Sequence, residues 1–344
     1  MIESRIRVAH VGPLVSVQDA GRFGSMRFGV PASGPMDRLA HAAANVALGK
    51  PAEAPALEVS LGGLTLECVA GAVTLAVAGG GFAVDHEGRR KPSWSVFTLD
   101  SGQRMSVKAG EWGSWAYIAF SGNLHASRWL GSAATHSLSG LGGGLLTSGQ
   151  ELRVTEARRA PSLEGAVPVP ELAAALQRAR VVMGPQERHF EATAITALST
   201  ATYTLSAAYD RMGVRLDGES LPLRSALTIP SEPVVRGSIQ VAGDGVPTVL
   251  LADHQTTGGY PKIATVISND LDQFAQLRPG QNVGFEPITP REAVAHARAR
   301  HEDVADYLET LPNARSTLTH RLRGENLISG VVSASDKSGD GSER

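Results

Sequence analysis

Short hydrophobic runs dominate the chain, and glycine or polar turn residues interrupt them about every ten positions. Many short β-branched runs at such spacing are typical of sheets or barrels, and not of a repeated strand–helix–strand array. The pattern therefore predicts a mainly β protein. The predicted strands are Arg5–His10, Ala56–Leu61, Leu64–Val69, Val73–Ala78, Ser95–Leu99, Arg104–Val107, Trp115–Phe120, Glu151–Val154, Ala179–Met183, Thr202–Leu205, Gly213–Leu216, Leu227–Ile229, Ser238–Val241, Thr248–Asp253, Ile263–Ile267 and Asn282–Glu286.

Helical spacing of apolar residues occurs in few places. The segment Gly34–Gly49 predicts one helix, with Pro35 at a first helical position. A second helix is expected from residue 289 onward, because Thr289 and Glu292 have the spacing of a capping box. A short helix is predicted at Glu171–Arg178.

A proline-rich stretch after residue 160 divides the chain, since prolines disfavour both helix interiors and central strands. The small polar residues at the C-terminus predict a disordered tail. The predicted divisions are a first β unit over 1–160, a linker over 161–178, a second β unit over 179–288, a helical extension over 289–330 and a tail over 331–344.

Composition and missing motifs exclude several classes of protein. Thirty-two basic and 34 acidic side chains give a net charge near −2, so no global field favours nucleic acid or membranes. The single cysteine, Cys68, allows neither an internal disulfide nor a cysteine cluster for zinc, and with no apolar membrane span it favours a cytoplasmic location. No phosphate-loop, Gly-x-Ser-x-Gly or His-Glu-x-x-His motif is present, and no metal site is predicted. The run Gly79–Gly81 is interpreted as a turn.

Four segments combine turn residues with polar groups, and the first is Val17–Gly24. Its glycines allow backbone N–H groups to point into a pocket. Its side chains at Gln18, Asp19 and Arg22 add an amide, a carboxylate and a planar donor fork. A solvated loop closed by an aspartate turn is the alternative interpretation.

The second and third segments are each consistent with two interpretations. Gly29–Arg38 leads into the predicted helix, whose free N–H groups favour an anion, although Asp37 there has an alternative role in stabilising the helix end. Ser206–Arg215 contains the adjacent pair Asp210 and Arg211. The arginine suits bidentate binding of a carboxylate or carbonate, and a surface ion pair is the alternative.

The fourth segment, Val249–Ala264, gives the strongest indication of a functional site. An apolar strand leads into a dense polar turn and a second apolar strand follows, an arrangement that places chemistry on a rigid support. Gly258 and Gly259 free the backbone, and a cis bond at Tyr260–Pro261 would fix the turn. A purely structural turn is the alternative. The polar residues that converge there are Asp253, His254, Gln255, Thr256, Thr257 and Lys262.

Taken in order, these segments resemble the family that includes allophanate hydrolase subunit 2, the C subunit of bacterial ATP-dependent 5-oxoprolinase and the carboxyltransferase subdomains A and B of urea carboxylase. The resemblance covers about residues 5–287. The matching stretches are Ser16–Arg22, Gly29–Asp37, Ala56–Gly63, Asp210–Arg215 and Gln255–Lys262, of which the last is the most specific.

The resemblance implies two cyclophilin-like β-barrel subdomains with a few helices. It also implies a partner subunit with subdomains C and D, and a substrate site where the two subunits meet. Both family reactions act on planar amides and develop negative charge on oxygen, so Lys262 and Arg211 are candidates to stabilise it. Asp253 or Asp37 would position an amide N–H or transfer a proton. The predicted substrate-binding residues are Gln18, Asp19, Arg22, Met36, Glu58, Asp210, Gln255, Thr256, Thr257, Gly258, Gly259 and Tyr260.

Three functions follow as hypotheses. The first is a subunit of an ATP-dependent complex that opens the 5-oxoproline lactam to glutamate. This hypothesis allows a further lactam-hydrolase subunit in the complex. The second is a biotin-dependent carboxyltransferase subunit acting on urea or a similar amide, which requires biotin on a separate carrier because no Met-Lys-Met motif is present. The third is a non-catalytic binding or regulatory subunit. No motif here binds a cofactor, so ATP would be used elsewhere in the complex.

Overall fold

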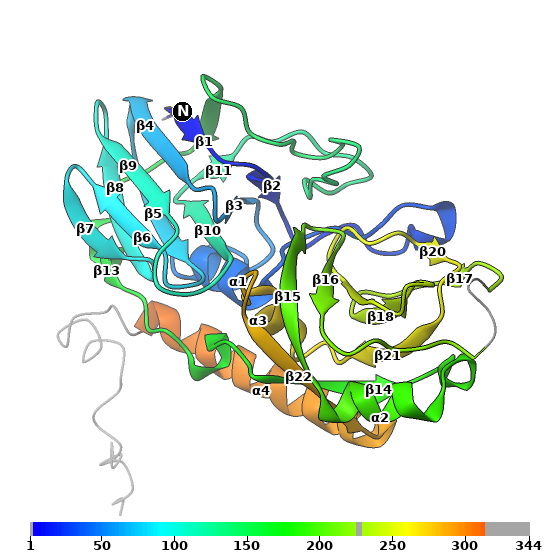
Figure 1. Cartoon of the computed structure of the whole chain (residues 1–344). Coiled ribbons are helices and arrows are strands. Elements are labelled where there is room, and N and C mark those ends of the chain that lie inside the picture. The colour runs from blue at the N-terminus through cyan, green and yellow to red at the C-terminus, as the bar shows by residue number, and fades with distance from the viewer. Residues whose placement is uncertain (1–2, 225–228, 314–344) are drawn as a thin grey trace, which may run out of the picture.

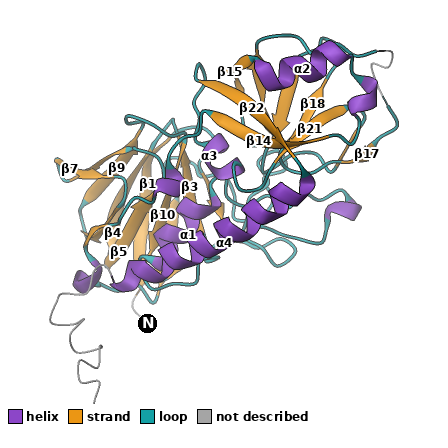
Figure 2. Cartoon of the chain, turned by 90° about the horizontal axis from the view of Figure 1, so that it is seen from below, coloured by secondary structure: helices purple, strands orange, loops and turns teal. Residues whose placement is uncertain are grey.

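Two β-rich units lie side by side, and a long C-terminal helix runs along both of them (Figures 1 and 2). The structure is a computed structural model that describes residues 3–224 and 229–313. The first unit contains two sheets and the second contains a closed barrel.

The first unit consists of a seven-stranded and a six-stranded sheet. The first sheet has the order β11 (Asn123–Leu124), β12 (Glu151–Thr155), β1 (Glu3–Val11), β4 (Leu64–Ala70), β9 (Arg104–Lys108), β6 (Ala83–His86) and β7 (Arg89–Pro92). The second has the order β13 (Gly165–Ala166), β8 (Ser95–Asp100), β5 (Ala72–Ala78), β10 (Trp115–Phe120), β3 (Ala56–Ser60) and β2 (Ser16–Gln18).

Strand β5 shows why the sequence of the central strands is apolar at successive positions. Its Leu75 and Val77 face a core shared by the two sheets, whereas Ala76 and Ala78 belong to a second core that includes α1 (Arg38–Val46). A strand buried on both faces reads as a continuous hydrophobic run, while β4, covered on one face, alternates between buried and partly buried residues.

The second unit is a closed barrel that is antiparallel except where β14 and β22 pair in parallel. Outside the barrel, β17 (Glu232–Pro233) pairs with β20 (Thr257–Gly258). The barrel order is β14 (Arg178–Met183), β21 (Lys262–Val266), β18 (Ser238–Val241), β19 (Pro247–Leu250), β16 (Gly213–Asp217), β15 (Thr202–Tyr209) and β22 (Asn282–Ile288).

Helices cover the sheets and connect the two units. Besides α1 they are α2 (Ala192–Thr200), α3 (Leu271–Ala275) and α4 (Pro290–Asn313). Short 3-10 turns occur at Met26–Phe28, Pro161–Leu163, Glu171–Ala173 and Glu187–His189. Helix α4 contacts the barrel through the Nδ2 of Asn269, which donates to the carbonyl of His296 at 2.6 Å. In Figure 2, which views the molecule from below, α4 runs diagonally across the front of both units, next to α1.

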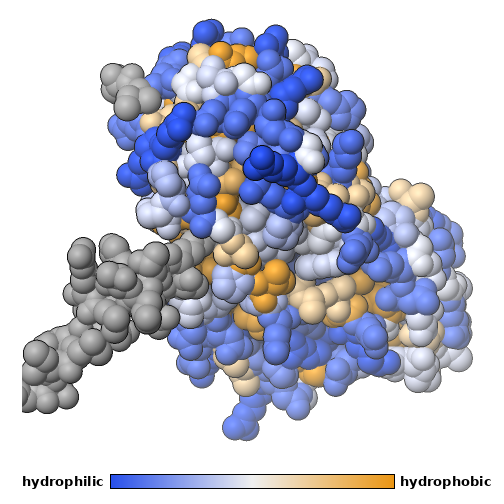
Figure 3. Space-filling model, turned by 90° about the vertical axis from the view of Figure 1, so that its left-hand side faces the viewer, coloured by the Kyte–Doolittle hydropathy of each residue, from blue (hydrophilic) through white to orange (hydrophobic). Residues whose placement is uncertain are grey.

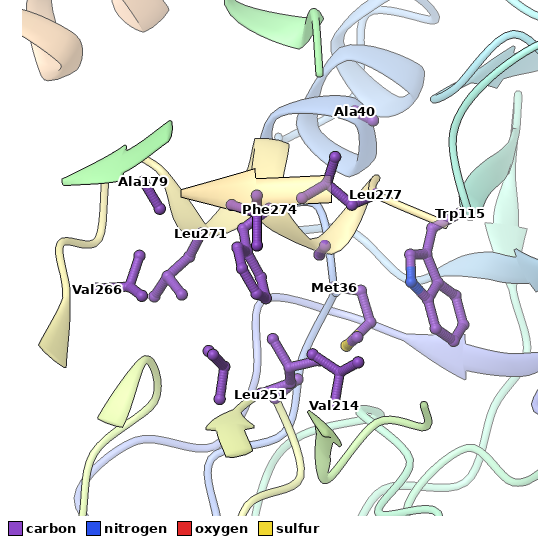
Figure 4. Packing of buried hydrophobic residues seen from close by; sticks show 14 of the residues in the cluster. Met36, Ala40, Trp115, Ala179, Val214, Leu251, Val266, Leu271, Phe274 and Leu277 are labelled. Atoms are coloured by element: carbon purple, nitrogen blue, oxygen red, sulfur yellow. The ribbon is translucent and has the colours of Figure 1, made fainter. Parts of the chain in front are cut away.

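The two units share one hydrophobic core at their junction (Figure 4). Met36 and Trp115 enter it from the first unit, and Leu251, Leu271 and Phe274 enter it from the second. All five are at most 3% exposed, and each fully buried large side chain contributes roughly 1.5–3 kcal/mol to the free energy of folding. The junction is therefore packed like a protein interior. By contrast, hydrophilic residues cover most of the face in Figure 3.

The prediction of a mainly β fold with few helices is confirmed. The capping box is also confirmed, since the backbone N–H of Glu292 donates to the hydroxyl of Thr289 at 3.2 Å and the N–H of Thr289 donates back to the Glu292 carboxylate at 2.8 Å. Part of the predicted linker, 161–178, packs on the first unit, because β13 pairs with β8.

Several local predictions are wrong. The predicted helix Glu171–Arg178 is only a 3-10 turn, because Arg178 already pairs with Gly284 at the start of β14. Helix α1 begins at Arg38, three residues after Pro35, because the Asp37 side chain caps it by accepting from the N–H of Ala40 at 2.9 Å.

Three further comparisons with the predictions concern a peptide bond, a helix and segments outside the described residues. Within the described residues the cis bond is Gly184–Pro185, so Tyr260–Pro261 is trans. Helix α2 was not predicted, because its hydrophobic residues lack a sharp stripe. Most of the predicted strand Leu227–Ile229, the end of the helical extension and the tail 331–344 lie outside the described residues.

Candidate functional site

Arg211 lies at the centre of a buried ionic cluster between the two units. Its Nε and Nη2 atoms donate to the two carboxylate oxygens of Asp253 at 2.9 and 3.0 Å. Its Nη1 pairs with Glu58 of β3, and its Nη2 also donates to the carbonyl of Gly34 at 2.8 Å. The three charged side chains are fully buried. Protein partners thus occupy every nitrogen of the guanidinium.

The Asp253 carboxylate also connects the two units. It accepts from the backbone N–H of Ser137 at 2.9 Å, so the barrel residue also fixes a loop of the first unit. Burial alone would raise the pKa of Asp253, but the Arg211 charge and hydrogen bonds outweigh it and lower this pKa to about 2. Desolvation opposes the charge of Arg211 as well, yet the two carboxylates raise the pKa of the guanidinium overall.

Glu58 extends the cluster toward helix α1. Its Oε2 accepts from the N–H of Met36 and from the hydroxyl of Tyr117, both at 2.8 Å. The Tyr117 hydroxyl in turn accepts from the N–H of Asp37 at 2.8 Å. These bonds satisfy backbone donors near the start of α1, and the predicted site residues Met36 and Glu58 therefore shape the segment that enters the helix.

Asp37 is buried and performs two structural tasks. Besides capping α1, its carboxylate accepts from the Nε2 of Gln276 at 2.7 Å, which joins the first unit to the end of α3. Burial and the neighbouring charge of Asp272 raise the pKa of Asp37 to about 7. Asp272 pairs with Arg38 at 2.9 Å, so a second ionic contact crosses the junction.

The segment Val17–Gly24 is held from within the first unit. Asp19 accepts from the hydroxyl of Ser132 at 2.6 Å and from two consecutive backbone N–H groups, those of Ala133 and Ala134. Arg22 donates to the carbonyl of Ala134, and its guanidinium carbon lies 4.7 Å from the ring centre of Trp129. These side chains fix the loop around residue 133, although the Nη1 of Arg22 has no hydrogen-bond partner within the described residues.

Lys262 differs from the charged residues of the junction cluster. It is 3% exposed, yet no protein group hydrogen-bonds its Nζ in the described part of the chain. The nearest opposite charge is Oε2 of Glu232 at 3.7 Å, on a side chain that is 46% exposed. The Lys262 backbone N–H donates to the side chain of Gln186 at 2.9 Å, which fixes the start of β21. A buried ammonium with free donors is costly unless a ligand engages it.

The polar turn after β19 lies beside a cavity of about 330 Å³. Gln240, Gln255, Tyr260 and Asp210 are among its lining residues. Asp210 points its carboxylate at the N–H groups of its own turn, those of Met212 and Gly213. Tyr260 is 45% exposed at the edge of the turn.

The structure thus divides the predicted site residues into two groups. Arg211, Asp253, Glu58 and Asp37 meet in the junction cluster, where each has protein partners, and their catalytic roles stay predictions. Gln255 and Tyr260 line the cavity, whereas Gly258 lies in the polar turn and Lys262 begins the strand that follows it. Thr256 and Thr257 also lie in this turn, and Gln18 lies at the end of β2, 117 residues from the Thr135 carbonyl that it contacts.

Sequence reasoning missed several residues that complete these clusters. The missed residues are Tyr117, Gln186, Glu232, Gln240, Asp272 and Gln276. For Tyr117 a signal was available, because its hydroxyl lies inside an otherwise apolar predicted strand. Gln240 gave a weaker signal, because its predicted strand also contains Ser238.

Two negative observations concern the described residues. No group of three or more histidine, cysteine, aspartate or glutamate side chains there is arranged to hold a metal ion. No helix within 3–224 and 229–313 is long and apolar enough to cross a membrane.

The glycine run 79–81 offers no phosphate cradle. A Cβ on Gly81 would lie 2.4 Å from the Trp112 ring, so the indole fills the space beside this turn. The interpretation of the run as a turn fits this packing.

Comparison with known proteins places the chain in a family. A carboxyltransferase domain model, subdomain A and B, matches residues 28–287. The C subunit of the Haemophilus influenzae 5-oxoprolinase is 31% identical over 90% of this chain and 100% of that protein, and its Escherichia coli counterpart is 33% identical over 89% and 97%.

A solved structure supports the same assignment. The urea amidolyase of K. lactis matches with a TM-score of 0.79 and 25% identity, covering 89% of this chain. The chain spans only 20% of that much longer protein. The two 5-oxoprolinase relatives are enzyme subunits, and the resemblance seen in the motifs is confirmed. The chain belongs to the family of carboxyltransferase domains built from subdomains A and B.

Proposed function

We propose that the chain is a subunit of an ATP-dependent complex that opens the lactam ring of 5-oxoproline to give glutamate. The observation that carries this proposal is the match to the C subunit of 5-oxoprolinase over essentially the whole of two relatives. The match to urea amidolyase, in contrast, involves a fifth of that protein. The free ammonium of Lys262 supports the proposal, because ring opening develops negative charge on the lactam oxygen.

In this proposal the chain's own residues act in two ways. Lys262 stabilises the developing oxyanion from a buried position, where a charge interacts more strongly than it does in water. Arg211, Asp253 and Asp37 hold the two β units in register, so that the turn carrying Lys262 keeps its position. Catalysis gains from such prior positioning, because the donor does not need to reorganise during the reaction.

The remaining parts of the reaction belong to partners. One partner carries subdomains C and D, and a further protein supplies the rest of the lactam hydrolase. ATP is placed on the partner subunits in this proposal, in line with the missing phosphate-loop motif in this sequence.

A second candidate is a biotin-dependent carboxyltransferase subunit acting on urea or a similar amide. The similarity to the K. lactis urea amidolyase favours it. That function requires a separate biotin carrier. A third candidate, a binding subunit without turnover, predicts assembly with partners and neither activity.

Reconstitution with the partner subunits distinguishes these candidates. The assembled complex is given 5-oxoproline and ATP, and glutamate release is measured. In parallel, transfer of carboxyl from carboxybiotin to urea is measured with the same preparation. Glutamate release that requires this chain supports the proposal, whereas carboxyl transfer without glutamate release supports the second candidate. An assembled complex with neither activity supports the third.

A further inference from the structure

Two side-chain amides form a pair at the cavity beside the polar turn. The Nε2 of Gln255 donates to the Oε1 of Gln240 at 2.8 Å. Gln240 is 4% exposed, and its own Nε2 has no hydrogen-bond partner within the described residues. The pair therefore leaves one buried N–H donor free on Gln240.

The same pair also leaves an acceptor free. The side-chain oxygen of Gln255 accepts no hydrogen bond from the described residues, while its nitrogen is engaged by Gln240. Turning both amides by 180° exchanges the donor and the acceptor between the two residues but leaves one of each. A donor and an acceptor side by side complement one edge of a cis amide, which offers a carbonyl oxygen and an N–H together.

Gly258, a glycine of the predicted motif, leaves space beside this amide pair. A Cβ on Gly258 would lie 2.6 Å from the Nε2 of Gln240 and 3.3 Å from that of Gln255. The glycine is therefore required by close packing against both amides. It pairs in β20 with Glu232, the residue whose carboxylate lies 3.7 Å from the ammonium of Lys262.

Gln240 and Lys262 are direct partners across two barrel strands. Their Cα atoms are in register between β18 and β21, next to a bulge. Residues that are directly opposite in an antiparallel pair have their side chains on the same face. Two buried donors without protein partners, an amide N–H and an ammonium, thus belong to one short stretch of the barrel.

We propose that Gln240 and Gln255 determine specificity by binding the amide edge of the substrate. This inference rests on the proposed function and adds residues that recognise the lactam. Gln240 donates to the lactam carbonyl oxygen, the atom that Lys262 stabilises when it becomes charged, and Gln255 accepts from the lactam N–H. A site that pairs both groups rejects analogues that lack one of them, because a buried polar group is then left unpaired.

The first test replaces the free donor with an acceptor. In the reconstituted complex, Gln240→Glu places a carboxylate oxygen where the lactam carbonyl oxygen binds. We expect the KM for 5-oxoproline to rise at least about tenfold, with a smaller change in kcat. Gln177→Glu is the matched control, because Gln177 lines a different cavity. An unchanged KM for Gln240→Glu in a folded, assembled complex overturns the inference.

The second test needs no variant and therefore does not depend on folding. The lactone analogue of 5-oxoproline has a ring oxygen in place of the N–H and nearly the same shape. Binding of both compounds to the wild-type complex is measured by calorimetry without ATP. We expect the lactone to bind at least about tenfold more weakly, and Gln255→Leu to reduce this preference. Equal binding of lactam and lactone by the wild type contradicts the role of Gln255.

These results separate the inference from the proposed function. If the wild-type complex releases no glutamate from 5-oxoproline, the proposed function fails, and urea becomes the amide probe in the same calorimetric experiment. Urea binding that Gln240→Glu weakens would still support recognition of an amide edge by this pair. Binding of neither amide would overturn it.

Discussion

The junction cluster around Arg211 and the polar turn before Lys262 contain similar residues but differ in how those residues are satisfied. In the junction, Glu58, Asp253 and the guanidinium are fully buried and bonded to one another. At the turn, Lys262 and Gln240 are almost as deeply buried, yet each keeps a donor without a partner among the described residues. We therefore interpret the first group as maintaining the fold, and our proposal assigns ligand binding to the second group.

The largest effect on stability is expected for Arg211→Met. This change leaves the carboxylates of Glu58 and Asp253 buried without their cation, and breaking such a pair typically costs about 3–5 kcal/mol. The free energy of unfolding is measured with chemical denaturant. A loss below about 1 kcal/mol, the range of surface ion pairs, would show that the junction does not maintain the fold.

The next prediction concerns pH and Asp37, whose pKa is raised to about 7 by burial and by Asp272. The folded state holds this proton more tightly than the unfolded chain does. The protonated carboxyl of Asp37 therefore adds to the free energy of unfolding at low pH, and this stabilisation is lost as pH rises toward about 7. We expect the wild type to lose stability relative to Asp37→Asn over this range, by at most about 1.4 kcal/mol per pH unit.

The comparison with Asp37→Asn is needed because His41 acts in the opposite direction. Burial lowers the pKa of His41 to about 4, so its contribution is lost as pH falls. Both proteins contain His41, so the difference between their unfolding free energies at about pH 5 and about pH 8 isolates Asp37. A constant difference would contradict the raised pKa.

A smaller effect is expected for Tyr117→Phe. The hydroxyl donates to Glu58 and accepts from the N–H of Asp37, both at 2.8 Å, so its removal leaves two buried polar groups short of one partner each. We expect a loss of about 1–3 kcal/mol in thermal or chemical unfolding. The substitution leaves Trp115 and the other core residues unchanged. An unchanged free energy of unfolding would therefore mean that the two hydrogen bonds of Tyr117 add little to the stability of the junction.

The smallest effect on stability is expected for Glu232→Gln at the other region. Its carboxylate is 46% exposed and 3.7 Å from Lys262, so the attraction is weak and screened by water. We expect a change within about 1 kcal/mol in unfolding free energy. A loss as large as that of Arg211→Met would show that Lys262 belongs to a structural ion pair after all.

Much of the fold could be predicted because its strands carry local signals. The β5 and β10 runs are apolar on both faces, and the capping box at Thr289 specifies where α4 starts. Helix α2 could not be predicted in this way, since its alanines and threonines form no sharp apolar stripe. The 3-10 turn at Glu171 differs from the predicted helix because pairing of β14 with β22, distant in sequence, determines where the strand begins.

The candidate site could be located from the sequence, but the state of its residues could not. The motif at Gln255–Lys262 predicted the polar turn, and the structure places it beside a cavity. Sequence could not indicate that Arg211 is saturated by Glu58, 153 residues away, or that the Nζ of Lys262 is not. The partners of Arg211 depend on packing of the two β units, whereas the surroundings of Lys262 and the partnership of Gln240 with Gln255 depend on how the second unit itself folds.

The most direct test that Lys262, unlike the junction cluster, acts on the substrate is turnover by the reconstituted complex containing Lys262→Met. Exposed Lys108→Met is the control. We predict a loss of at least about a hundredfold in glutamate release, because the oxyanion loses a preorganised donor. The free energy of unfolding should stay equal or rise, since the ammonium that is removed has no hydrogen-bond partner in the described residues. Unchanged turnover in an assembled complex would contradict the account.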